Sequence, residues 1–131
     1  MLEYNLIEGG FMGKVYYNET KVIIDDMKRI YGPDDLDWMS YLITVRNVLT
    51  YHHIIKECDG GLLELSNGAL LTKKAHRLLN MTEIKDYNLY LAWNELFKEI
   101  NKRKEPMDDY LREESKSLKL HTHKLIYGGE F

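Results

Sequence analysis

The stretch 50–104 changes its residue pattern several times, and the order of these changes limits the fold more than any other feature. Residues 50–56 are rich in β-branched and aromatic side chains, which are typical of strands. Residues 57–61 contain paired glycines, which accept positive φ without steric cost and indicate a turn. A second short strand is expected within 62–71, and Thr72 then caps a helix. This order of strand, turn, strand and helix predicts an α+β fold.

Apolar residues at helical spacing predict two helices before this unit. The first begins near Thr20 and is stopped by Gly32 and Pro33. The second is expected over 34–49, capped by Asp34, with one apolar stripe that contains Trp38, Leu42, Val45 and Leu49. We interpret both helices as packing elements of the core. Residues 1–19 are expected to form a loop, with a short strand near 14–17.

Helices are also expected after the unit. An interruption is predicted at 80–82, followed by a long helix over 83–104 that ends before Pro106. A last helix is expected over 108–120, and residues 121–131 are expected to be an extended or disordered tail. The chain is therefore predicted to hold one domain over 1–120, whose central motif lies at 50–80, and a C-terminal tail.

Composition narrows the class of protein. The 131 residues correspond to about one domain, and the formal net charge of -3 argues against a protein that coats nucleic acid non-specifically. Cys58 is the only cysteine, so one chain can form neither an internal disulfide nor a zinc site built from cysteines. No targeting segment and no apolar run that could span a membrane is evident, and we expect a cytoplasmic protein without a membrane partner.

Three histidines fall inside the unit, at His52, His53 and His76. Hydrolysis of a phosphodiester needs a base that takes a proton from water, a cation that stabilises the leaving oxygen, and groups that hold both. Imidazole can be that base because its unperturbed pKa is about 6.5, and neutral imidazole also binds metals. The three histidines therefore predict a metal-dependent phosphodiesterase site. The plainer alternative is that a histidine pair lies at the surface or is satisfied in the core.

Residues 51–80 resemble the HNH endonuclease family, the ββα-metal nucleases. The run His52-His53-Ile54-Ile55, with Gly60-Gly61 after it, is similar to the first strand and turn of that family. The run Asn67-Gly68-Ala69-Leu70-Leu71 is similar to its central asparagine and the apolar strand that follows. His76 then stands where the family places a metal ligand on the helix. The resemblance implies a ββα-metal core flanked by N-terminal and C-terminal helices.

The resemblance also implies a role for each of these residues. His52 and His76 would be metal ligands, His53 would be the general base, and Asn67 would orient His53 by bonding to nearby backbone. Adjacent residues of a regular strand point to opposite faces, so either the strand bends at the pair or the metal and phosphate lie across its end. Flanking His76 on its helix are three basic residues that either grip substrate phosphates or form a solvated face: Lys73, Lys74 and Arg77.

The sequence departs from the family in two ways. Many members carry cysteine pairs that bind a structural zinc, and this chain cannot, so we expect its helices to supply the rigidity. Where some members have a further ligand one turn beyond the helical histidine, this chain has Asn80. Two imidazoles, phosphate oxygens and water would suit Mg²⁺ or Mn²⁺, with Zn²⁺ or Ni²⁺ as alternatives. His121 and His123 could chelate a metal, although a basic tail is the simpler interpretation.

The expected function is therefore that of an HNH-type endonuclease, a hydrolase that nicks DNA or cuts both strands. The alternative is a catalytically silent HNH-like module that binds nucleic acid or a protein partner, for example in a phage or mobile element. No base-reading motif is evident, so little intrinsic sequence specificity is expected. The sequence does not indicate the oligomeric state.

Overall fold

Two short antiparallel strands and the helix that follows them form the centre of the protein. The structure is a computed structural model that describes residues 18–32, 35–46 and 48–128. Strand β1 (Leu49–His53) pairs with β2 (Gly68–Thr72) so that Leu49 lies opposite Thr72 and His53 opposite Gly68. Helix α2 (Lys73–Lys85) begins directly after β2, and its N-cap Thr72 accepts a hydrogen bond from the backbone N–H of Ala75. The predicted cap is confirmed.

The connection between the strands contains two short 3-10 turns, η1 (Glu57–Asp59) and η2 (Leu65–Asn67). The two positions after η1 require glycine for different structural reasons. Gly60 has φ 91°, a left-handed conformation that favours glycine. Gly61 lies so close to the chain that a Cβ there would stand 1.8 Å from the backbone oxygen of Ile55. This turn therefore depends on glycine at both positions.

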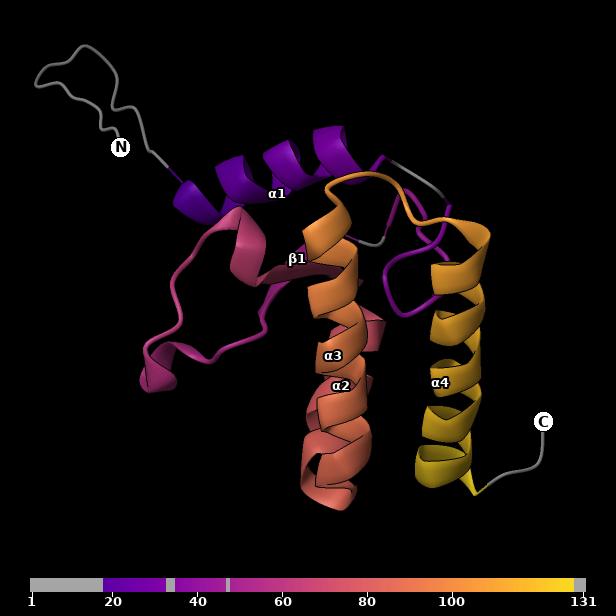
Figure 1. Cartoon of the computed structure of the whole chain (residues 1–131). Helices are drawn as coiled ribbons and strands as arrows, with labels where there is room; N and C mark the ends of the chain where they lie inside the picture. Colours follow the sequence, from indigo (N-terminus) through magenta and orange to yellow (C-terminus); the bar gives the residue numbers. More distant parts are fainter. Residues whose placement is uncertain (1–17, 33–34, 47, 129–131) are drawn as a thin grey trace, which may run out of the picture.

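Three further helices surround the hairpin: α1 (Glu19–Tyr31), α3 (Tyr87–Arg103) and α4 (Asp109–Tyr127). The prediction for α1 is confirmed, including its end at Gly32. Figure 1 shows α3 and α4 side by side, with α1 lying across one end of the molecule. The four helices and the two-stranded antiparallel sheet of the described residues confirm the predicted α+β class. No helix among the described residues is long and apolar enough to cross a bilayer.

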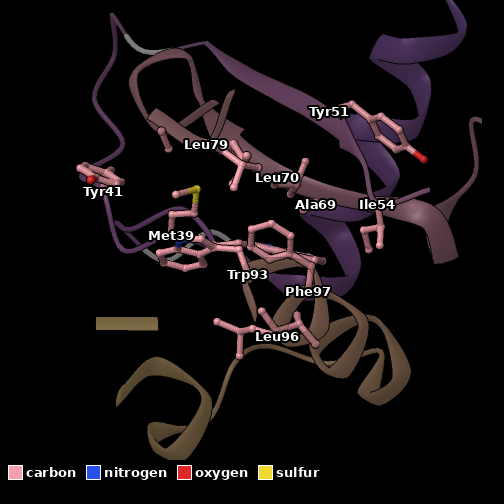
Figure 2. Close-up of a cluster of buried hydrophobic side chains, with 14 of the residues drawn as sticks. Met39, Tyr41, Tyr51, Ile54, Ala69, Leu70, Leu79, Trp93, Leu96 and Phe97 are labelled. Carbon is pink, nitrogen blue, oxygen red and sulfur yellow. The ribbon is translucent and has the colours of Figure 1, made fainter. Parts of the chain in front are cut away.

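Large aromatic side chains of α3 pack against β2 and make the middle of the core. Trp93 and Phe97 are fully buried, with stacked rings whose centroids lie 5.8 Å apart. Figure 2 draws them together with Ala69 and Leu70 of β2, which belong to the same buried cluster. Every residue of β2 is buried, so both faces of this strand are covered. Burial of one such aromatic side chain contributes up to about 3 kcal/mol, and this packing fixes the hairpin that carries the histidines.

The predicted helix over 34–49 is wrong for the residues that the structure describes. Asp34 lies outside them, and residues 36–42 form a tight loop closed by a bridge between Leu36 and Leu42. The buried carboxylate of Asp37 organises this loop, because it accepts from the backbone N–H groups of Met39, Tyr41 and Thr72. Two local bonds and the long-range bond from Thr72 replace the hydrogen bonds of a helix, as aspartate side chains can do.

Two predictions about the C-terminal half are also wrong. Helix α2 is not interrupted at 80–82, because Thr82 is buried and its hydroxyl donates to the carbonyl of Leu78 within the helix. The break comes instead at Asp86, which caps α3. The predicted tail is helical as far as Tyr127, because the buried Thr122 accepts a hydrogen bond from the Trp93 indole at 2.8 Å. Residues 129–131 lie outside the described part of the chain.

Candidate functional site

The three histidines singled out in the sequence line one cleft of about 240 Å³. His52 and His53 come from the end of β1, and His76 comes from α2. Six other residues complete the lining: Tyr51, Lys56, Glu57, Asn80, Glu83 and Tyr90. The fold therefore brings together side chains that are more than twenty residues apart in sequence.

The hairpin aims the neighbouring histidines in different directions. The ring of His52 stands edge-on to that of His76, with centroids 5.7 Å apart. The ring of His53 packs edge-on against Tyr51, with centroids 4.8 Å apart. The two rings point in different directions because adjacent side chains of a strand point to opposite faces of the sheet. Strand β1 ends at His53 and the chain then bends, so the cleft lies across the end of the strand.

The hydrogen bonds of Thr50 fix the tautomer of His76. The Thr50 hydroxyl has one proton, which it donates to the carbonyl of Leu71 at 2.9 Å. The same oxygen lies 2.8 Å from Nδ1 of His76 and must therefore accept from it. His76 consequently carries its proton on Nδ1 and has a lone pair on Nε2. Burial lowers its pKa, which favours this neutral form.

Asn94 of α3 fixes the tautomer of His52 in the same way. Nε2 of His52 lies 2.8 Å from the amide oxygen of Asn94, which can only accept, so His52 donates from Nε2 and has a lone pair on Nδ1. His52 is buried, and burial lowers its pKa to about 4. His52 is therefore neutral at physiological pH. A ring N–H held by a neighbour is the usual arrangement for a histidine that binds a metal through its other nitrogen.

His53 differs from the other two in having an uncommitted nitrogen. Its Nε2 is the one buried side-chain nitrogen or oxygen that makes no hydrogen bond among the described residues. Leaving such an atom unpaired costs roughly 1–3 kcal/mol, so folded proteins seldom tolerate it without a functional reason. His53 lines the cleft, but its Nε2 has almost no exposed surface, so the ring must turn before this nitrogen can accept a proton from a water in the cleft.

Asn67 closes the loop that follows His53. Its amide oxygen accepts from the backbone N–H of Ile55 at 2.8 Å. Its amide nitrogen donates to the carbonyl oxygens of Ile55 and Leu62, both at 3.0 Å. The backbone of Asn67 also accepts from Ile54, the residue next to His53. Asn67 thus bonds to backbone near His53 and fixes the end of β1.

The basic residues on α2 lie elsewhere. Lys73, Lys74 and Arg77 are exposed and are not among the residues that line the cleft. The Lys74 ammonium stands 5.6 Å from the centroid of the Tyr41 ring, beside α4. Lys73, Lys74 and Arg77 are therefore not part of the wall of the cleft.

The two C-terminal histidines are not arranged as a chelating pair. His121 and His123 are two positions apart on helix α4, and residues at that spacing do not face each other. His121 is exposed, whereas Nε2 of His123 lies 2.7 Å from the hydroxyl of Tyr41. His123 therefore helps attach α4 to the loop at 36–42.

Sequence reasoning missed Asn94, and the sequence does contain a signal for it. Tyr90, Asn94, Phe97 and Asn101 follow one helical stripe, and all four are buried. A polar residue in a buried stripe needs a specific partner. Asn94 has His52, and the Asn101 amide donates to the carbonyl of Gly68 at 2.7 Å. Asparagines on the apolar face of α3 could thus have been predicted to contact the motif.

A metal held by His52 and His76 would have two imidazole ligands, whose rings stand edge-on with centroids 5.7 Å apart. Among the described residues, no group of three or more His, Cys, Asp or Glu side chains is gathered so as to hold a metal ion. Any further ligands would be water or substrate oxygens.

The buried His52 should make stability depend on pH. Its pKa is about 4 in the folded protein and about 6.5 in an unfolded chain, so the unfolded state binds more protons between these values. The free energy of unfolding should therefore fall as the pH is lowered, by about 2 kcal/mol between pH 7 and pH 5 for this residue. Urea unfolding of the wild type and of His52→Gln at both pH values checks this. Equal pH dependence in the two proteins would contradict it.

Comparison with known proteins identifies no relative of this chain. No family model, curated protein or solved structure matches the chain. The residues of the cleft and their resemblance to the HNH motif are therefore the basis for a proposed function.

Proposed function

We propose that the protein is a metal-dependent endonuclease of the HNH type that hydrolyses phosphodiester bonds of DNA, with a ββα-metal core formed by β1, β2 and α2. One observation carries the proposal: His52 and His76 each donate one ring N–H to a neighbour and have a free lone pair, while Nε2 of His53 has no partner. Such hydrolysis requires a bound cation and a general base, and these three histidines would supply two ligands for the cation and one base. The choice of DNA rests on the resemblance to the HNH motif.

The residues of the cleft would act in the following way. His53 takes a proton from the attacking water at its uncommitted Nε2. His52 and His76 would hold a divalent cation, Mg²⁺ or Mn²⁺ with Zn²⁺ or Ni²⁺ as alternatives, and this cation would supply stabilisation of the charge on the phosphate and the leaving oxygen. Asn94 and Thr50 keep the two ligands in the required tautomers. Asn67 holds the backbone on which His53 sits.

The proposed activity predicts relaxation of supercoiled plasmid that depends on a divalent metal. The wild type is incubated with plasmid and with Mg²⁺, Mn²⁺, Ni²⁺ or Zn²⁺ in turn, and the nicked and linear forms are measured over time. EDTA should abolish the activity, because the water and the leaving oxygen then lack their cation. Nicking that continues at the same rate in EDTA would contradict the proposal.

A silent HNH-like module remains the second candidate, and Asn80 favours it. Asn80 is exposed in the cleft at the position one turn beyond His76, where a further metal ligand would strengthen binding. An amide is a poorer ligand there than imidazole or carboxylate. Absence of plasmid relaxation with all four metals, combined with retained DNA binding, would support the module instead.

A further inference from the structure

An ion pair lies in the wall of the histidine cleft. Lys56 follows β1, and its ammonium contacts the carboxylate of Glu83 on α2. Both residues line the cleft together with the histidines. The backbone of Lys56 is well fixed, because its carbonyl accepts from the N–H groups of Asp59 and Gly61. The Lys56 and Glu83 side chains are 44% and 24% exposed, so a ligand in the cleft can reach both.

Lys56 is the one lysine or arginine among the residues that line the cleft. Two carboxylates, Glu57 and Glu83, share this lining with it. With neutral histidines the wall therefore has an excess of one negative charge, which repels a phosphate. Without a bound cation, a phosphate can be bound there only if Lys56 turns to it from Glu83. A bound divalent cation would reverse the sign of the total charge.

Resting on the proposed function, we propose that Lys56 is the phosphate-binding residue of the cleft and that Glu83 competes with the substrate phosphate for it. In the free protein the Lys56 ammonium pairs with Glu83. In the complex it donates to a non-bridging oxygen of the phosphodiester, and Glu83 turns to solvent. The exchange costs little, because a partly exposed ion pair contributes little to stability. This assigns the phosphate contact to Lys56 rather than to Lys73, Lys74 and Arg77.

Competition predicts opposite effects for the two partners. Lys56→Ala should weaken binding of a short fluorescein-labelled DNA duplex about tenfold, since it removes a charge-assisted hydrogen bond. Glu83→Gln should strengthen binding about threefold, because Lys56 is then free. Fluorescence anisotropy in EDTA and in Ca²⁺ measures both affinities at several salt concentrations. The slope of log K against log salt should fall by about 0.9 in Lys56→Ala, as expected for one lost phosphate contact.

A matched control is available on α3, where Lys102 and Glu99 form an exposed ion pair at 3.6 Å outside the cleft. Lys102→Ala and Glu99→Gln change the net charge equally and should alter DNA affinity less than twofold. Equal effects at the two pairs, weaker binding by Glu83→Gln, or no measurable binding by any of the proteins would each overturn the proposal. Opposite effects at Lys56 and Glu83 without plasmid relaxation would support it while contradicting the proposed catalysis.

Discussion

Replacement of His53 by alanine is expected to reduce DNA cleavage by a factor of about 10²–10⁴, the usual contribution of a general base. The physical reason is the uncommitted Nε2, which is the proposed acceptor of the proton from water. The same substitution removes an unpaired buried atom, so the fold should lose little. We expect the free energy of unfolding to stay within about 1 kcal/mol of the wild type, since the lost ring packing and the relieved penalty offset each other. Single-turnover cleavage of a labelled duplex and urea unfolding measure the two effects.

His121→Ala is the matched control for this substitution. His121 is an exposed histidine of α4 outside the cleft, so its loss should leave cleavage unchanged. If His53→Ala cleaves within threefold of the wild type, His53 is not the base. If the His53→Ala variant unfolds, the His53 ring of the wild type has a structural role beyond its packing against Tyr51.

Asn67→Ala is expected to have the largest effect on stability in the motif. The substitution removes the Asn67 partner of the Ile55 N–H and carbonyl and one of the two partners of the Leu62 carbonyl, which keeps its contact with the Tyr51 hydroxyl. At about 1–3 kcal/mol for a buried group, and less where water can enter, the total should be roughly 2–4 kcal/mol. Cleavage should also fall by at least about tenfold under conditions where the variant is folded, because the backbone that orients His53 is released. Urea unfolding and the cleavage rate at low temperature measure both effects.

Two further variants distinguish the loss of the Asn67 side-chain hydrogen bonds from a general destabilisation of the loop. Asn67→Asp keeps the acceptor for the Ile55 N–H but places a carboxylate oxygen against the Ile55 and Leu62 carbonyls, so it should be at least as destabilising as Asn67→Ala. Ser66→Ala changes an exposed neighbour in η2 and should cost less than about 0.5 kcal/mol. A loss of less than 1 kcal/mol in Asn67→Ala would show that the amide does not hold the loop.

The hairpin and its helix could be predicted from sequence because their signals are local. Strand composition, paired glycines and the cap Thr72 each act over a few residues, and β1, β2 and α2 occur in the predicted order, although β1 ends at His53 rather than Lys56 and α2 continues to Lys85. The convergence of His52, His53 and His76 on one cleft follows from that order of elements. Their chemical roles stay predictions.

The parts that sequence reasoning missed depend on contacts between distant residues. The stripe of Trp38, Leu42, Val45 and Leu49 has helical spacing, but the Asp37 carboxylate bonds to Thr72 more than thirty residues away and holds a loop. Helix α4 extends beyond 120 because Thr122 bonds to Trp93 on another helix. Local propensity cannot report either contact.

The pairing of Asn94 with His52 is a third contact of this kind, and it matters most for function. Asn94 decides which nitrogen of His52 is available, yet it lies on another helix forty-two residues away. The same holds for Lys56 and Glu83, whose contact could not be read from either segment alone. A motif thus predicts the residues that act, whereas the fold determines the neighbours that set their protonation and charge.

The most direct test of the central claim is the initial rate of plasmid nicking by wild type, His53→Ala and His121→Ala, prepared in parallel and assayed with Mn²⁺ and with EDTA. We expect equal rates for wild type and His121→Ala in Mn²⁺, a rate lower by at least about 10² for His53→Ala, and no nicking in EDTA. Equal rates for all three proteins, or no nicking by any of them with any of the four metals, would contradict the assignment of this cleft as a nuclease site.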